Sequence, residues 1–315
     1  MIFAGSVKID DFDCWEMKKR LVCFEDKGQT PVHLDHYKDR KMFVILDSGA
    51  FSAWTKGKSI DIDEYVDLII KNDSSICMAA NLDIIPGKKG DRQITEETNI
   101  RAASDGWKNY LRILETLKWN GREDLCSRIM PIHHQGESID FLKRMVDFGC
   151  EYIGISPSND ATTNQRKKYL DLAFGYLENC GTRIFTHGYA VTSEELMALY
   201  PWLTVDSISW IFTAGLGFVK TPYGNMCFSE DPRSLKLKEN MRITVNEDGD
   251  FGIDNAEFVH LKKEVEDYFS NLNINIFDLS RHYMYRAIAN MFYFQIWEKS
   301  NARRSFSQRE TQITF

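Results

Sequence analysis

Two carboxylates stand at the ends of short apolar, β-branched runs that lie far apart in the chain. Asp47 follows residues 43–46 and opens the sequence DSGAFS, and Asp206 follows residues 203–205 and opens the sequence DSISW. A carboxylate at the end of a buried strand is poorly solvated unless a cleft or a partner takes it. Two such groups in one site can cut or exchange a glycosidic bond. One would attack C1′ of a nucleoside, and the other would move protons on the bases.

Apolar runs alternate along the chain with amphipathic stretches, which predicts a parallel sheet with helical crossovers. The predicted strands are residues 2–4, 43–46, 76–82, 129–132, 152–155, 184–186 and 203–205. The predicted helices are residues 63–71, 95–119, 138–148, 164–179 and 193–199, with Ser138 and Ser193 as N-caps. Seven or eight such units most economically make an α/β fold of the (β/α)8 TIM-barrel type. A doubly wound open sheet is the alternative.

The pattern changes after residue 225. Residues 241–245 and 250–253 flank the sequence EDG, which predicts a hairpin, and residues 256–269 and 280–299 are predicted to be helical. We expect one domain over residues 1–300, with the core motifs in 1–225 and the hairpin and closing helices in 226–300. Residues 301–315 are expected to form a flexible tail.

Composition restricts the class of protein. The 315 residues are 43% hydrophobic, which predicts a packed core, and the net charge of −7 offers no general attraction for nucleic acid. No apolar run approaches the roughly 18–20 residues that cross a bilayer, and the first residues lack the features of a secretion signal. The seven cysteines contain no CxxC pair, which favours reduced thiols in a cytoplasm over disulfides or structural zinc. We therefore expect a cytoplasmic protein with no membrane partner.

In a parallel barrel, functional side chains sit at the carboxyl ends of the strands. The polar or glycine residues that close successive apolar runs include Asp47, Asp83, Gln135, Gly136, Gly154, Ser156, His187 and Asp206. Amides and carboxylates beside glycine can bind the edge of a purine-like base, because glycine lets a flat ring approach the backbone. His133 and His134 could be metal ligands, but no third ligand stands at a suitable spacing. We expect no metal and no cofactor.

The two acidic motifs resemble those of a known family. DSGAFS resembles the DSG(G/S)FQ motif of the tRNA-guanine transglycosylases, and DSISW, followed by TPYG at residues 221–224, resembles the nucleophile strand of the archaeal branch. Asp83 and Gln135-Gly136 fall between them in the expected order. The match covers roughly residues 1–225. It implies a (β/α)8 barrel that exchanges guanine for a 7-deazaguanine.

The resemblance also implies roles for individual residues. Asp206 would be the nucleophile that forms a glycosyl-enzyme intermediate, and Asp47 would be the general acid and base. Asp83 and Gln135, with the adjoining Gly136, would bind the purine edge, and residues 154–156, from Gly154 to Ser156, would offer backbone groups to the base. We add His187 to the base-binding set only from its position at a strand end.

The chain also departs from the family pattern. The tRNA enzymes carry a CxCxxC…H zinc site after the nucleophile strand, whereas Cys227 stands alone in that region. The chain is also too short for the RNA-binding domains of the archaeal enzymes. It is therefore most similar to the branch of bacteriophages and bacterial genomic islands, which places 7-deazaguanines in DNA. We expect DNA with a flipped-out or single-stranded guanosine and a free 7-deazaguanine base as partners, and a monomer or weak dimer.

Lys88, Lys89 and Lys220 lie in predicted loops after strands, and we expect them to bind DNA phosphates. Three other functions remain open. The protein could be a tRNA-guanine transglycosylase that lacks the zinc site, or a hydrolase of nucleosides or deazaguanine nucleosides. It could also be a barrel without activity that binds DNA or another partner. The sequence does not indicate which 7-deazaguanine is used or the DNA sequence context.

Overall fold

The computed structural model describes residues 1–5, 17–38, 40–86, 95–228 and 241–305, which form two compact units. The barrel unit comprises the described residues from Ile2 to Ser207. The C-terminal unit comprises Met1 and the described residues from Ile208 to Ser305. The boundary between the units therefore falls inside the DSISW motif. Of the predicted tail, residues 301–305 continue a helix, and residues 306–315 lie outside the described part.

The barrel unit contains a nearly closed, barrel-like sheet in which every pairing is parallel. Its hydrogen-bonded order is β5-β4-β3-β2-β1-β9-β8-β7-β6. The strands are β1 (Ile2–Phe3), β2 (Lys19–Cys23), β3 (Phe43–Asp47), β4 (Met78–Ala80), β5 (Ile129–Met130), β6 (Ile132–His134), β7 (Tyr152–Ser156), β8 (Phe185–Gly188) and β9 (Thr204–Ser207). The parallel sheet expected from the sequence is thus confirmed.

The two strands at the ends of this order, β5 and β6, follow one another in the chain with only Pro131 between them. The predicted strand over residues 129–132 is therefore interrupted. Proline has no N–H to donate to a ladder. On one side of Pro131, β5 pairs with β4, and on the other side β6 pairs with β7. The chain itself therefore joins the two ends of the sheet.

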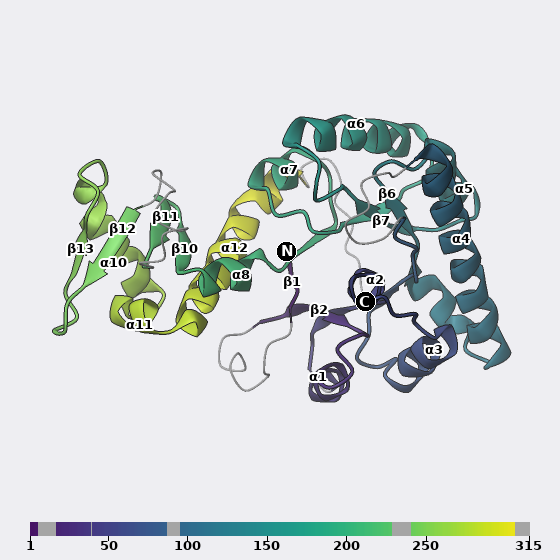
Figure 1. Cartoon of the computed structure of the whole chain (residues 1–315), viewed down its shortest axis with the longest axis horizontal. Helices are drawn as coiled ribbons and strands as arrows, with labels where there is room; N and C mark the ends of the chain where they lie inside the picture. Colours follow the sequence, from purple (N-terminus) through teal and green to yellow (C-terminus); the bar gives the residue numbers. More distant parts are fainter. Residues whose placement is uncertain (6–16, 39, 87–94, 229–240, 306–315) are drawn as a thin grey trace. The chain divides into compact units, whose positions relative to one another are not determined.

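Helices lie around the outside of this sheet (Figure 1). They are α1 (Thr30–Tyr37), α2 (Ala50–Lys56), α3 (Ile62–Lys71), α4 (Glu96–Trp119), α5 (Ile139–Asp147), α6 (Thr163–Asn179), α7 (Glu194–Leu199) and the 3-10 helix η3 (Glu123–Arg128). The hydroxyls of Ser138 and Ser193 accept backbone N–H groups at the starts of α5 and α7, which confirms both predicted N-caps.

Alternate residues of the strands fill the interior of the barrel unit. One packed cluster combines Ile2, Leu21, Ile45, Met78, Met130 and Tyr152, each from a different strand. Successive side chains on a strand point to opposite faces. The row through Ile45 therefore continues to Asp47, and the row through Phe185, which packs on the same cluster, continues to His187. This alternation places the polar strand ends on the inner face.

The C-terminal unit has a four-stranded sheet in the order β10-β11-β12-β13. Its elements are α8 (Ser209–Gly215), β10 (Phe218–Thr221), β11 (Gly224–Cys227), β12 (Met241–Val245), β13 (Phe251–Ile253), the 3-10 helix η4 (Val259–Leu261), α10 (Lys262–Asn271), α11 (Ile276–Arg281) and α12 (Tyr283–Ser305). The antiparallel pairing of β12 with β13 confirms the predicted hairpin. The TPYG sequence forms the turn between β10 and β11.

The side chain of Asn290 on α12 forms hydrogen bonds to both α8 and β10. Its Nδ2 donates to the carbonyl of the fully buried Trp210, and its Oδ1 accepts the backbone N–H of Lys220 at 2.7 Å. Across the described residues of both units, no helix combines the length and apolarity that a membrane crossing requires.

Candidate active site

Asp47 closes β3 on the inner face of the sheet. Its Oδ2 accepts the backbone N–H of Gly49 at 3.1 Å. A Cβ atom on Gly49, which has φ +80°, would lie 2.8 Å from Cγ of Glu25, so this tight turn requires glycine. Burial, followed by the negative charges of Asp83 and Asp206, raises the pKa of Asp47 to about 7. Asp47 can therefore both release and accept a proton near neutral pH.

Asp206 lies on β9, and its side chain is 11% exposed. Its Oδ1 accepts the backbone N–H of Ala190 at 2.9 Å and lies 3.4 Å from Nε2 of His187. Ala190 has φ +51°, a left-handed conformation that is uncommon for a residue with a Cβ atom. On the other side of the His187 ring, Nδ1 lies 2.8 Å from Oγ1 of Thr204. The orientation of the Asp206 carboxylate is thus set by the segment that ends and follows β8.

A third carboxylate, Asp83, follows β4 and contacts a histidine. Nε2 of His134 lies 2.7 Å from Oδ2 of Asp83, and the backbone N–H of His134 is donated to Oε2 of Glu137 at 3.2 Å. Burial acts to lower the pKa of His134, but the contact with Asp83 and the charges of Asp83 and Glu137 outweigh it, so this pKa is raised. Burial raises the pKa of Glu137 to about 7. Asp83, His134 and Glu137 thus form one cluster of interacting titratable groups beside β4 and β6.

Tyr189 lies among the three aspartates. After burial, the charges of Asp47, Asp83 and Asp206 raise its pKa well above the ordinary value. Its hydroxyl oxygen is buried and has no hydrogen-bond partner among the described residues. A Cβ atom on Gly154 would lie only 2.6 Å from Cε2 of Tyr189. The ring of Tyr189 therefore packs against Gly154, and the contact of Gly154 with a base remains a prediction.

The structure brings Asp47, Asp83 and Asp206 close enough for the charges of the other two to raise the pKa of Asp47. His187 is fully buried, and its ring nitrogens face Thr204 and Asp206. Its placement therefore points to contact with the predicted nucleophile, and the base-binding role given to it remains a prediction.

Gln135 is engaged by neighbouring backbone. Its Oε1 accepts the N–H of Ser158 at 3.0 Å, and its own backbone N–H is donated to the carbonyl of Ser156 at 2.9 Å. The carbonyl of Gly136 accepts Nδ2 of Asn99 at 3.2 Å. Gln135, Gly136 and Ser156 thus lie together where β6 and β7 end, and their contact with a base remains a prediction.

One of the three predicted phosphate-binding lysines lies in the described part of the chain. Lys88 and Lys89 lie outside the described residues. Lys220 lies on β10 of the C-terminal unit, where its Nζ is 5.5 Å from the ring centroids of both Tyr293 and Phe294. The contact of all three lysines with DNA stays a prediction.

His133, which the sequence left open as a metal ligand, is buried, and both of its ring nitrogens contact polar groups of the barrel unit. Its Nδ1 lies 2.9 Å from the hydroxyl of Tyr169, and its Nε2 lies 3.2 Å from the carbonyl of Ser138. Burial lowers the pKa of His133 to about 4. Within the described ranges, no three His, Cys, Asp or Glu side chains are grouped so that they could hold a metal ion.

Sequence reasoning considered His134 only as a metal ligand. It did not assign roles to several other residues of this site: Glu137, Tyr152, Tyr189, Ala190 and Thr204. The signal that could have found Tyr152 and Thr204 is the two-residue period of the strands. Tyr152 shares the inner row of β7 with Gly154, and Thr204 shares that of β9 with Asp206.

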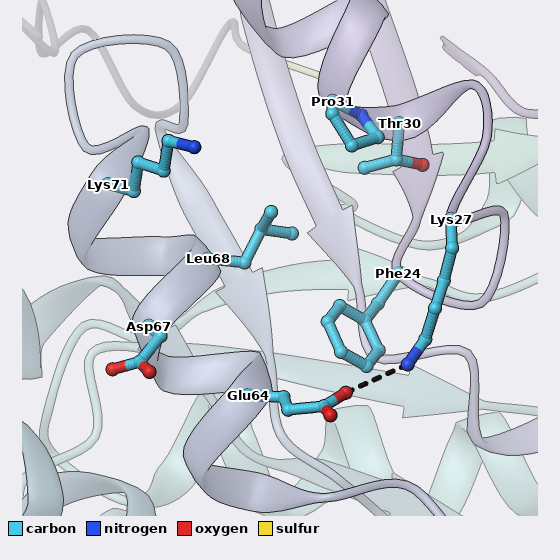
Figure 2. Close-up of a pocket in the computed structure, with 8 residues that line it drawn as sticks. All are labelled: Phe24, Lys27, Thr30, Pro31, Glu64, Asp67, Leu68 and Lys71. Carbon is cyan, nitrogen blue, oxygen red and sulfur yellow. Dashed lines mark hydrogen bonds and ion pairs between the residues drawn. The ribbon is translucent and has the colours of Figure 1, made fainter.

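A small cavity of about 10 Å³ lies within the acidic cluster, lined in part by Asp83, His134 and Glu137, and two larger pockets lined by described residues open at the surface of the barrel unit. The larger, of about 840 Å³, is lined by parts of α2, α3 and α4 and by the segment after β4, including Asp83. It therefore opens beside the acidic cluster. The smaller, of about 300 Å³, lies between α1 and α3, where Phe24 and Leu68 face its interior and an ion pair joins Lys27 to Glu64 (Figure 2). None of the predicted site residues line the smaller pocket.

Comparison of the chain with models of known protein families found no match, and comparison with curated proteins found none. The function is therefore inferred from the acids, their surroundings and the motifs that contain them.

Proposed function

We propose that the protein exchanges bases at an N-glycosidic bond, replacing guanine in DNA with a 7-deazaguanine. The observation that carries this proposal is the placement of Asp47 and Asp206 at the carboxyl ends of β3 and β9 in one sheet, close enough for their charges to interact. A proton donor and a nucleophilic carboxylate are the two groups that this exchange needs. The raised pKa lets one group act as an acid in the first half-reaction and as a base in the second.

The proposed reaction has two balanced steps. A carboxylate oxygen of Asp206 bonds to C1′ while the bond from C1′ to the guanine nitrogen breaks, and the departing base takes the electron pair and the proton of Asp47. The incoming 7-deazaguanine then gives the proton of its ring nitrogen to Asp47. That nitrogen bonds to C1′, and the electron pair of the C1′–oxygen bond returns to Asp206. One glycosidic bond replaces another, so the exchange requires no separate energy source.

The architecture supports this proposal. If β5 and β6 are counted as one strand interrupted at Pro131, the sheet has the eight strands of a (β/α)8 barrel. Such barrels carry their active sites at the carboxyl ends of the strands, where Asp47 and Asp206 stand.

DNA is proposed as the polymer because of the resemblance of the two motifs and because Cys227 stands alone where the tRNA enzymes have zinc ligands. A guanosine within a duplex must leave the stack before C1′ can be reached, at a cost of a few kcal/mol. The free cysteines of the described residues are compatible with the cytoplasmic location that we propose.

The test is incubation of the protein with a guanine-containing DNA and isotope-labelled 7-deazaguanine bases, followed by mass spectrometry of the nucleosides. Parallel reactions with tRNA separate the two polymers. Label in DNA supports the proposal. Label in tRNA alone, or release of guanine without incorporation, would replace it with the tRNA enzyme or the hydrolase.

A denaturing gel tests the nucleophile. We expect the wild-type protein to form a covalent adduct with DNA and Asp206→Asn to form none, because an amide is a poor nucleophile. Asp140→Asn removes an exposed carboxylate from α5 and serves as the matched control. An adduct formed by Asp206→Asn would contradict the assignment.

A further inference from the structure

We propose that a hydroxyl relay from Tyr152 through Thr204 fixes the tautomer of His187. His187 and the backbone N–H of Ala190 then hold one oxygen of Asp206 and leave the other oxygen to react. The reactive role of the second oxygen rests on the function proposed above, whereas the relay and the tautomer do not. His187 is in this view a positioning residue.

The direction of the relay follows from counting donors. Tyr152 is 8% exposed, and its hydroxyl bonds to Oγ1 of Thr204, its hydrogen-bond partner within the described part of the chain. A buried hydroxyl proton needs an acceptor, so Tyr152 donates to Thr204. The proton of Thr204 then has Nδ1 of His187 as its acceptor, at 2.8 Å. Nδ1 therefore carries a lone pair, and the ring proton lies on Nε2.

The opposite direction leaves a proton without a partner. If Nδ1 donated to Thr204 and Thr204 donated to Tyr152, the buried phenol proton would have no acceptor among the described residues. An unsatisfied buried donor costs about 1–3 kcal/mol. The arrangement that ends on the Nε2 proton satisfies the donors of both hydroxyls. Nε2 has no hydrogen-bond partner within the ordinary limit among the described residues, but it faces the Asp206 carboxylate at 3.4 Å, which attracts a proton on Nε2 and would repel a lone pair there.

Both groups that face the Asp206 carboxylate converge on the same oxygen. Ala190 donates its N–H to Oδ1 at 2.9 Å, and Nε2 of His187 lies 3.4 Å from Oδ1. The second distance is longer than an ordinary hydrogen bond, as catalytic hydrogen bonds often are before substrate binds. With Oδ1 hydrogen-bonded to Ala190 and facing His187, Oδ2 is the oxygen whose lone pair is directed to C1′.

The surroundings of His187 favour this role over contact with substrate. The residue is fully buried, and its ring packs edge-to-face against Tyr189 with 4.5 Å between the ring centroids. A neutral imidazole leaves the charge on Asp206 and moves no proton in the reaction. Partners that orient metal-binding side chains through hydrogen bonds typically change metal affinity or activity by about 10–100-fold when they are removed, and we expect an effect of similar size for this carboxylate.

The tautomer can be observed directly in protein labelled with ¹⁵N-histidine. The chain has seven histidines, and His187→Gln identifies the signals of His187 by their loss. We expect Nε2 of His187 to be protonated and Nδ1 to be unprotonated at pH 8. Thr204→Val should abolish this preference, whereas Thr204→Ser should keep it. A ring protonated on Nδ1, or on both nitrogens, would overturn the relay.

Adduct formation in a single turnover tests the consequence for Asp206. We expect Thr204→Val to slow adduct formation about tenfold with the Kd for DNA unchanged, and Thr204→Ser to restore the rate. A Thr204→Val rate equal to that of wild type would overturn the positioning role. If the wild-type protein shows the Nε2 tautomer but forms no adduct, the proposed function fails and the relay stands. If the protein forms the adduct but the His187 ring is protonated on Nδ1, the relay fails and the proposed function stands.

Discussion

Nε2 of His134 lies 2.7 Å from Oδ2 of Asp83, and the two side chains are only 21% and 11% exposed. This ion pair joins the end of β6 to the segment after β4. We expect Asp83→Asn to lower the pKa of His134, because burial disfavours the charged ring and the opposing carboxylate is lost. An NMR titration of the His134 ring measures the change. Asp63→Asn, which removes an exposed carboxylate, is the control, and an unchanged His134 titration in Asp83→Asn would contradict the pairing.

The raised pKa of Asp47 predicts a pH dependence for adduct formation. The first half-reaction requires the protonated carboxyl, which is lost as the pH rises through about 7. Above that value the single-turnover rate should fall about tenfold per pH unit. We expect Asp47→Asn to bind DNA but to form adduct very slowly at every pH. A wild-type rate that stays constant to pH 9 would exclude Asp47 as the acid.

Asp47 should also reduce stability at high pH. Its pKa is raised from 3.8 to about 7 in the folded protein, so between these values the folded state holds a proton that the unfolded state has released. The free energy of unfolding should therefore fall as the pH rises through this window. Asp47→Asn removes the buried charge and should stabilise the protein at pH 8 by on the order of 2–4 kcal/mol, with little effect at pH 4.

Urea unfolding at pH 4 and pH 8 measures this difference. Asp67→Asn removes an exposed carboxylate from α3 and should change neither value by much. Glu137, whose pKa is also raised to about 7, should leave part of the pH dependence in place. If Asp47→Asn and wild type had equal free energies of unfolding at pH 8, the buried charge of Asp47 would not destabilise the folded protein.

The close packing at Gly154 predicts a specific loss of stability. A Cβ atom there would lie 2.6 Å from Cε2 of Tyr189 and 3.1 Å from Cγ1 of Ile132. Gly154→Ala should therefore lower the free energy of unfolding by about 1–3 kcal/mol. Gly175→Ala is the matched control, because its Cβ atom would meet open space within α6 and should stabilise by up to about 1 kcal/mol. If both variants behaved alike, the contact of Tyr189 with Gly154 would be wrong.

The three lysines proposed to bind phosphates can be tested by salt dependence. Each phosphate contact contributes about −0.9 to the slope of log K against log salt for duplex DNA. Replacing Lys88 and Lys89 with glutamine should make the slope less steep by the contribution of about two phosphate contacts. Lys220→Gln should make it less steep by the contribution of about one. Binding of the free base should not change. An unaltered slope would remove the lysine concerned from the DNA-binding surface.

Much of the barrel unit could be predicted from the sequence because most of its strands are short apolar runs and α3 to α7 begin at side-chain caps. The helices α1 and α2 have no such cap and were missed. The strand β2 was missed for a physical reason. Arg20 is a charged residue within it, yet its side chain is 1% exposed and its guanidinium donates to the carbonyls of Phe3 and Gly5. Partners from another strand offset the charge, and no local pattern reveals them.

The candidate site was predictable only in part. Asp47 and Asp206 could be found because each acid closes an apolar run. The relay through Tyr152 and Thr204 could not, because it depends on which residues of β7, β8 and β9 stand opposite one another. The register pairs Gly154 with His187 and His187 with Thr204. Such alignment between strands is set by the assembled sheet and not by any one segment.

The left-handed backbone at Ala190 has a consequence for how this site tolerates change. The group that reaches Asp206 is a main-chain amide, and every amino acid except proline supplies the same amide at that position. Substitutions at residue 190 can alter the cost of the turn but cannot delete the donor. Of the two groups that face this carboxylate, a mutation can therefore remove the imidazole of His187. The amide of residue 190 is retained in every variant except proline.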